Sequence, residues 1–292
     1  MFSGSIPALV TPFKKDGAID EERLRFLIHW HIKNRSDAIL VCGTTGESAT
    51  LSHDEHKYVV KMAVEEARGR IPIIAGAGSN STTEALDLAK FAKKVKANAI
   101  LVITPYYNKP TQEGLYQHYK KISKEVAMPL IIYNVPSRTG TNILPQTVAR
   151  IYKDCRNVIG IKEASGSLDQ ISRLMTLVDR KFILLSGSDE ITLPILSVGG
   201  RGVISVVANI MPRKTHDLVA SFLKGDVEKS KKIQLYLYNL IKMLFIETNP
   251  IPVKTALGLM GLIEPNLRLP LCAMSKDNFA KLKMTLKKYS LI

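Results

Sequence analysis

The sequence predicts an α/β fold, because eight short apolar runs alternate with eight amphipathic stretches over the first three quarters of the chain. Apolar runs of this length are typical of strands that are buried on both faces, as in a parallel sheet. The units repeat at a fairly even spacing of about 25 to 30 residues, which a closed (β/α)8 barrel, or TIM barrel, explains most simply. No Gly-x-Gly-x-x-Gly motif follows the first apolar run, which disfavours an open, doubly wound sheet.

Each expected strand is followed by polar residues, glycine or proline. The expected strands span residues 6–10, 38–42, 71–75, 99–103, 130–134, 158–162, 182–186 and 202–206. The expected helices span residues 21–33, 53–68, 82–94, 112–126, 144–152, 168–178, 191–198 and 212–224. The alternation then stops, and further helices are expected at 226–247, 252–260 and 275–289. We therefore expect a catalytic barrel over residues 1–224 and a C-terminal α-helical region over residues 225–292.

The composition indicates a globular protein with an ample core. The chain has 292 residues, of which 46% are hydrophobic, and this suits one large α/β domain with a small appendage. No apolar run reaches the ~20 residues of a membrane span, and the first residues lack the positive segment of a signal peptide. Three cysteines at unrelated spacings predict neither a disulfide framework nor a zinc site, so we expect a reducing, cytoplasmic location.

The formal net charge of +15 raises the hypothesis of nucleic-acid binding. The lysines are nevertheless spread through the expected helices among acidic residues, and the densest basic stretch is the last helix. No nucleic-acid-binding motif is present, and no aromatic residues alternate with the basic ones, as a single-strand binder requires. We interpret the charge as solvated surface, with non-specific attraction to polyanions as the alternative, and expect neither a nucleic acid nor a membrane as partner.

The stretch 157–166 contains the residue most capable of chemistry. Lys162 ends the sixth expected strand, and barrel enzymes place their catalytic residues at the carboxyl ends of strands. Burial disfavours the ammonium form of lysine, and a neutral amine forms Schiff bases with ketones. Two simpler interpretations are a lysine that extends to solvent and one that pairs with Glu163.

The turn 43–47 and two tyrosines follow other expected strands. Thr44 and Thr45 offer hydroxyls that, with the backbone amides of the turn, are able to hold a carboxylate, although ordinary glycine turns share this composition. Tyr107 and Tyr133 end neighbouring strands, where a phenol beside an amine can relay the protons that imine formation moves. Buried tyrosines also commonly serve only in packing.

Arg138 and two glycines complete the expected barrel mouth. The planar guanidinium of Arg138 suits bidentate binding of a carboxylate, and Gly187 and Gly202 leave space for a substrate beside the backbone. No ligand set for a metal, phosphate-binding loop or nucleophile elbow accompanies them. These residues together predict an enzyme without metal or cofactor that acts on an oxo-acid through a lysine imine.

Several motifs resemble the signatures of the dihydrodipicolinate synthase / N-acetylneuraminate lyase family. They are Gly43-Thr-Thr-Gly-Glu47, Thr104-Pro-Tyr-Tyr-Asn108, Gln112-Glu-Gly-Leu-Tyr-Gln-His118, Tyr133-Asn-Val-Pro-Ser-Arg-Thr-Gly140, Gly160-Ile-Lys-Glu-Ala164, Gly202-Val-Ile-Ser205 and Asn249-Pro-Ile-Pro-Val-Lys254. The resemblance covers essentially the whole chain, with Ser165 and Val207 where threonine is frequent. It implies a class I aldolase-type lyase or synthase that condenses pyruvate with L-aspartate 4-semialdehyde at the entry to diaminopimelate and lysine biosynthesis.

The resemblance also implies catalytic roles. Lys162 would form the imine with pyruvate, and Tyr133 would donate and accept protons. Thr44 would link Tyr133 to Tyr107, which the family supplies from the neighbouring subunit. The family is usually a homotetramer built as a dimer of dimers, and whether this chain forms the tetramer or only the dimer stays open.

Further implied roles concern the substrates. Thr45 and the backbone at Ile204 would hold the pyruvate carboxylate. Arg138 would orient Tyr133 and bind the carboxylate of the semialdehyde, and Gly187 is the substrate-binding glycine that we expect beside them.

The same resemblance implies a second site. Family members that are inhibited by L-lysine bind the inhibitor at the tight dimer interface. The matching positions are Ser48, Ala49, His53, His56, Asn80, Glu84 and Tyr106. His53 and His56 lie three residues apart on one expected helix and can face the same way, and Glu84 would meet an ammonium group. We therefore expect feedback inhibition by L-lysine, with a helix start that carries solvated histidines as the alternative.

Sister activities on the same scaffold are the main alternative function. A sialic acid lyase or a 2-keto-3-deoxy sugar acid aldolase would share Lys162 and Tyr133. Arg138, the Thr44–Thr45 pair and Tyr107 favour the synthase. A non-catalytic binder of small oxo-acids is disfavoured, since binding alone requires no imine-forming lysine.

Overall fold

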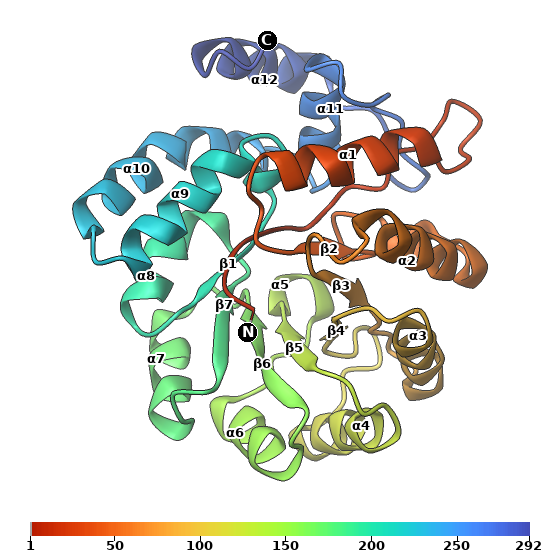
Figure 1. Ribbon diagram of the computed structural model, residues 1–292, viewed down its shortest axis with the longest axis vertical. Helices are drawn as coiled ribbons and strands as arrows, with labels where there is room; N and C mark the ends of the chain where they lie inside the picture. The colour runs from red at the N-terminus through yellow and green to blue at the C-terminus, as the bar shows by residue number, and fades with distance from the viewer. Residues whose placement is uncertain (1) are drawn as a thin grey trace.

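A closed parallel barrel forms the centre of the molecule, and helices surround it (Figure 1). The computed structural model describes residues 2–292. The strands follow the order β1-β8-β7-β6-β5-β4-β3-β2 and pair in parallel throughout. A parallel bridge between Ala8 and Leu40 joins the end of the first strand to the second and closes the barrel. The expected TIM barrel is confirmed.

The strands and helices alternate as expected, and their ends differ from the expected ones by only a few residues. The strands are β1 (Gly4–Pro7), β2 (Ile39–Val41), β3 (Ile73–Gly76), β4 (Ala99–Ile103), β5 (Leu130–Asn134), β6 (Val158–Glu163), β7 (Ile183–Ser186) and β8 (Gly202–Ser205). The helices between them are α1 (Glu21–Lys33), α2 (His53–Ala67), α3 (Thr82–Lys94), α4 (Gln112–Glu125), α6 (Pro145–Asp154), α7 (Leu168–Leu177), α8 (Thr192–Ser197) and α9 (Pro212–Leu223).

Residues on successive strand positions enter two separate hydrophobic clusters. On β5, Leu130 and Ile132 join the large cluster between the strands and the helices, whereas Ile131 and Tyr133 join the smaller cluster inside the barrel. This alternation is the two-residue period of a strand, whose successive side chains point to opposite faces. It determines which polar side chains at the strand ends point inward.

One glycine in the site strand has a packing role. A Cβ atom on Gly160 of β6 would lie only 2.0 Å from the carbonyl oxygen of Ile183 on β7. The two strands therefore approach as closely as they do only because Gly160 has no side chain. Gly160 therefore allows β6 to pair with β7 along its length, up to Lys162.

The last helices are α10 (Val227–Met243), α11 (Ile251–Leu259) and α12 (Lys276–Lys288). Figure 1 shows α10 beside α9 and α11 near α1. These helices agree with the expected helical region, whereas its separation from the barrel as a distinct domain stays a prediction. In residues 2–292 there is no helix that is both long enough and apolar enough to cross a membrane.

A short helix, α5 (Pro136–Thr139), lies between β5 and α6, where no helix was expected from the sequence. Proline at its first turn has the φ angle that a helix needs, and Gly140 ends the helix with a φ of 67°. The helix contains Arg138, which lines the cavity at the barrel mouth.

Candidate active site

Lys162 is the residue around which the polar side chains of the barrel mouth gather. It lies on β6 between its strand neighbours Tyr133 and Leu185, and only 6% of it is exposed. Its Nζ atom lies 4.1 Å from the centre of the Tyr133 ring. The salt bridges found within residues 2–292 do not include Lys162. A buried amine therefore packs against a phenol ring without a carboxylate to neutralise it.

Glu163 does not pair with Lys162, although it is the next residue. Adjacent residues on a strand point to opposite faces, and Glu163 accepts hydrogen bonds from Asn134 Nδ2 at 3.1 Å and from the backbone N–H of Ser165 at 2.6 Å. Burial raises the pKa of the Glu163 carboxyl group, and these hydrogen bonds oppose that effect. Both simpler interpretations of Lys162, exposure to solvent and pairing with Glu163, therefore disagree with the structure.

A cavity of about 240 Å³ contains Lys162 at the carboxyl ends of the strands. It is lined by Thr44, Thr45, Tyr133, Val135, Ser137, Arg138, Lys162, Ala164, Gly187, Ser188, Glu190, Ile204, Val206, Phe245 and Asn249. The fold thus brings together the catalytic and substrate-binding residues expected from the sequence, except Tyr107 and Gly202. The expectation for Gly202 is wrong, because a Cβ atom there would lie 2.1 Å from the carbonyl oxygen of Gly4, so this glycine allows β8 to pair closely with β1.

Gly187 preserves the space beside the amine. A Cβ atom on this residue would lie 3.2 Å from Cε of Lys162 and 2.7 Å from Cβ of Ala164. Any larger side chain at this position would displace the lysine or fill the cavity. The role in substrate binding that we expect for Gly187 therefore has a steric reason.

The Thr44–Thr45 turn approaches the same cavity from β2. It is tight, because the backbone N–H of Gly46 donates to Gly43 O at 3.1 Å and that of Glu47 donates to Thr44 O at 3.1 Å. The hydroxyl of Thr11 also donates to Gly46 O at 2.6 Å, which anchors the turn to the segment after β1. The two threonines are therefore on a restrained backbone.

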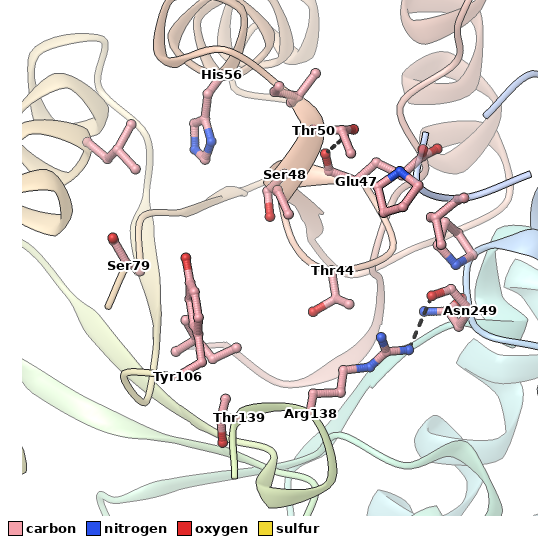
Figure 2. A pocket seen from close by; sticks show the side chains of 18 of the residues that line it. Thr44, Glu47, Ser48, Thr50, His56, Ser79, Tyr106, Arg138, Thr139 and Asn249 are labelled. Carbon is pink, nitrogen blue, oxygen red and sulfur yellow. Dashed lines mark hydrogen bonds between the residues drawn. The ribbon is translucent and has the colours of Figure 1, made fainter. Parts of the chain in front are cut away.

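Asn249 is a site residue that has no distinctive signal of its own in the sequence, although it lies within a family motif. Its Nδ2 atom donates to Thr45 Oγ1 at 2.9 Å, over a separation of 204 residues. Its backbone carbonyl oxygen accepts a hydrogen bond from Arg138 Nη2 at 3.2 Å, which Figure 2 shows as a dashed line. One buried asparagine from the segment before α11 thus fixes both a hydroxyl and a guanidinium at the barrel mouth.

Asp189 does not line the cavity but lies between Ser188 and Glu190, which do, and no role was expected for it from the sequence. It lies in a short 3-10 helix (Asp189–Ile191) and its Oδ2 atom accepts hydrogen bonds from the backbone N–H groups of Val206 at 2.9 Å and Val207 at 3.0 Å. These two residues directly follow β8, which carries Ile204. Burial raises the pKa of the Asp189 carboxyl group. Asp189 thus connects the segment after β7 to the backbone that follows β8.

Tyr107 lies outside the cavity that contains Lys162. It is 89% exposed, and its φ of 68° belongs to the left-handed region that non-glycine residues rarely adopt. Within one chain it instead borders an open depression together with Tyr106, Lys109 and Arg138. A single chain therefore presents Tyr107 outward, away from the amine.

A larger cavity of about 440 Å³ adjoins the first one at Thr44, and Figure 2 shows side chains that line it. Six of the seven positions expected to bind L-lysine line it: Ser48, Ala49, His53, His56, Glu84 and Tyr106. Asn80 is not among its lining residues, and its carbonyl oxygen instead accepts a hydrogen bond from Asn108 Nδ2 at 2.9 Å. Thr44, Arg138 and Asn249 line both cavities, so the two share a wall.

His56 and Glu84 give the larger cavity its polar character. His56 Nε2 lies 2.7 Å from the carbonyl oxygen of Gly76. Because a carbonyl oxygen only accepts, Nε2 carries the proton and the lone pair of Nδ1 remains available. Burial lowers the pKa of His56, which favours the neutral ring. Glu84 accepts a hydrogen bond from Ser79 Oγ at 2.7 Å. A neutral acceptor and a carboxylate suit a bound ammonium group.

Comparison with known proteins places the chain in a defined group. The model of the dihydrodipicolinate synthetase family matches residues 1–289. The chain is 55% identical, over the full length of both proteins, to the 4-hydroxy-tetrahydrodipicolinate synthase of Sulfurihydrogenibium sp. (strain YO3AOP1). It is 44% identical, with a TM-score of 0.98 and full coverage of both chains, to the dihydrodipicolinate synthase of Acinetobacter baumannii complexed with pyruvate. The lysine-bound synthase of Cyanidioschyzon merolae is 37% identical with a TM-score of 0.96, and 100% of this chain and 99% of that chain are covered.

Replacement of Asp189 by alanine tests its connection to β8. Two buried N–H groups would lose their acceptor, so we expect the free energy of unfolding to fall by about 2 to 4 kcal/mol. Asp189→Asn retains one acceptor oxygen and should lose less. Urea denaturation measures both variants, and an alanine variant as stable as the parent protein would contradict this role.

Proposed function

The chain belongs to the dihydrodipicolinate synthetase family, and from this premise we propose how the cavity around Lys162 carries out its chemistry. The activity is that of a 4-hydroxy-tetrahydrodipicolinate synthase, which condenses pyruvate with L-aspartate 4-semialdehyde in lysine biosynthesis. The observation that best supports the mechanism is the buried, unpaired amine of Lys162 beside the Tyr133 phenol. All three cysteines are free thiols, which supports our inference of a reducing, cytoplasmic location.

The reaction begins when the lone pair of Lys162 Nζ attacks the ketone carbon of pyruvate. Loss of water gives an imine, and loss of a proton from the methyl group converts this imine into an enamine. The enamine carbon attacks the aldehyde carbon of the second substrate, whose oxygen takes up a proton. The amino group of that substrate then attacks the imine carbon, closes the ring and releases Lys162.

Tyr133 is the group that moves protons in these steps. Its ring lies against the amine, and it lines the same cavity as Thr44. A phenol held beside the reacting nitrogen can donate a proton to the departing hydroxyl and later take one back. Thr44 extends this route toward the depression that Tyr107 borders.

Thr45 holds the pyruvate carboxylate. Its Oγ1 atom accepts the hydrogen bond from Asn249, so its own hydroxyl hydrogen remains available to a carboxylate oxygen. The backbone at Ile204 contributes from β8, and Gly187 leaves the necessary space. Arg138, directed by its bond to Asn249, binds the carboxylate of the semialdehyde and orients Tyr133.

Trapping the imine tests the mechanism. Incubation with pyruvate followed by borohydride should modify Lys162, as mapped by mass spectrometry. The variant Lys162→Met should form no adduct and lose at least about a thousandfold in kcat, because the nucleophile is absent. Tyr133→Phe should lose about a hundredfold or more in kcat.

The exposed lysine Lys90 provides the control, and Lys90→Met should match the parent protein. An adduct absent from Lys162 would refute the mechanism. Turnover of sialic acid in preference to the semialdehyde would favour a sister activity.

A second copy of the chain supplies Tyr107 in our proposal. The exposure of Tyr107 and its position beside Arg138 support a dimer in which each tyrosine reaches the Thr44 of its partner. A dimer of dimers is the larger assembly that we expect from the family. Analytical ultracentrifugation at the concentration used for assays should show a dimer or tetramer, and a fully active monomer would exclude a tyrosine supplied by a partner.

The larger cavity binds L-lysine in our proposal and regulates the enzyme. The side-chain ammonium or α-ammonium of the ligand would meet Glu84 and the free Nδ1 of His56. Since Thr44 and Arg138 border both cavities, a ligand there contacts the same side chains that the reaction needs.

Titration of the activity with L-lysine checks this proposal. Inhibition should appear by about millimolar lysine, since a few hydrogen bonds of this kind provide an affinity in that range. The variant His56→Leu should need about tenfold more lysine, relative to its own uninhibited rate, because one acceptor is lost. A parent protein that keeps full activity in millimolar lysine would contradict regulation at this site.

A further inference from the structure

Glu47 and Lys254 form the most deeply buried of the salt bridges found in residues 2–292. Lys254 Nζ lies 2.6 Å from Glu47 Oε1, and the two side chains are 0% and 1% exposed. The other side chains in these salt bridges are at least 11% exposed. Neither residue has a role in the chemistry described above. The pair nevertheless lies directly behind the Thr44–Thr45 turn.

The contribution of this pair to the free energy of folding does not account for its presence. Burial lowers the pKa of Lys254 to about 8, and the attraction of Glu47 offsets this effect only in part. Keeping the ammonium group charged therefore opposes folding. Buried ion pairs can generally be replaced by apolar residues of similar volume without loss of stability. Stability alone is therefore a weak explanation for a charged pair at this position, and the contacts of the pair supply a geometric one.

The pair closes a ring of contacts around the turn. Lys254 Nζ donates to Glu47 Oε1 and also to the carbonyl oxygen of Thr11 at 2.9 Å. The hydroxyl of Thr11 in turn donates to the carbonyl oxygen of Gly46, the residue before Glu47. Glu47 itself has a φ of 53° in the left-handed region, so its backbone must be held in a costly conformation.

The second oxygen of Glu47 is also bound by the C-terminal part of the chain. Its Oε2 atom accepts a hydrogen bond from the backbone N–H of Arg268 at 3.2 Å. The guanidinium of Arg268 pairs with Glu55 at the start of α2 and lies over the Phe13 ring, 4.4 Å from its centre. Lys254 lies over the same ring at 4.2 Å. Both cations therefore pack against one aromatic side chain beside the turn.

Helix α11 thus meets the turn at two points. Asn249, just before the helix, donates to Thr45, and Lys254, within its first turns, binds Glu47. Two contacts determine an orientation that one contact would leave free to rotate.

We propose that the Glu47–Lys254 pair is a positioning device for the reaction, which holds the Thr44–Thr45 turn against α11 so that both hydroxyls keep their direction into the cavity. This inference rests on the proposed roles of Thr44 and Thr45. Because Thr45 binds the pyruvate carboxylate and Thr44 relays protons, loss of the pair affects the KM for pyruvate as well as kcat.

The test compares removal of one charge of the pair with removal of both. The variants are Glu47→Met, Lys254→Met and the double variant with both changes, and Lys90→Met, which breaks the exposed pair with Glu125, is the matched control. Measurements are the Tm, the steady-state constants for pyruvate, and the borohydride-trapped adduct on Lys162. The single variants should have a much lower Tm than the double variant, since each leaves a buried charge without its partner.

The double variant should have a Tm between those of the single variants and the parent protein, since the carbonyl oxygen of Thr11 and the N–H of Arg268 lose their partners but no buried charge is left unpaired. Its KM for pyruvate should rise about tenfold or more, and its kcat should fall. Lys90→Met should match the parent protein in all three measurements. A folded double variant with unchanged KM and kcat would overturn the positioning role and leave the pair purely structural. If the double variant fails to fold, Glu47→Gln, which keeps the side-chain length, decides by the same kinetic criterion. A parent protein without an adduct on Lys162 would instead refute the proposed mechanism.

Discussion

The burial of an unpaired amine at the end of β6 is the constraint on which the rest of the site depends. A lysine inside a barrel loses the hydration of its ammonium group, and no carboxylate within residues 2–292 forms a salt bridge with it. The strand register places Tyr133 beside it, and the glycine at 187 preserves space on its other side. Nearby Glu163 is directed to the opposite face, where its hydrogen bonds are satisfied by Asn134 and Ser165.

The barrel mouth is completed by segments that lie far away in the sequence. Asn249 fixes Thr45 and Arg138, and Asp189 holds the backbone that follows β8. The C-terminal helices are therefore part of the site, because α11 follows directly after Asn249 and carries Lys254. A barrel without them would keep Lys162 and Tyr133 but would lose the groups that orient the surrounding loops.

The shared wall between the two cavities gives the proposed regulation a short physical route. A ligand in the larger cavity would lie against Thr44 and Arg138, which also line the cavity of Lys162. In the mechanism that we propose, such a ligand would alter proton relay or carboxylate binding by shifting the direction of one hydroxyl or one guanidinium, because catalysis depends strongly on the orientation of the reacting groups.

The sequence by itself determined the order of strands and helices, since apolar runs and helical periodicity are local properties. The bounds of β4, β5, α1 and α3 agree with the expected ones, and Lys162, Tyr133 and the Thr44–Thr45 turn were recognised from their motifs. Tertiary structure alone revealed the roles of Asn249, Asp189 and Lys254, because the partners that define them lie elsewhere in the chain: Thr45 for Asn249, the backbone after β8 for Asp189, and Glu47 for Lys254. It also showed that Tyr107 faces outward in a single chain, because exposure depends on the whole fold and not on the residues nearby.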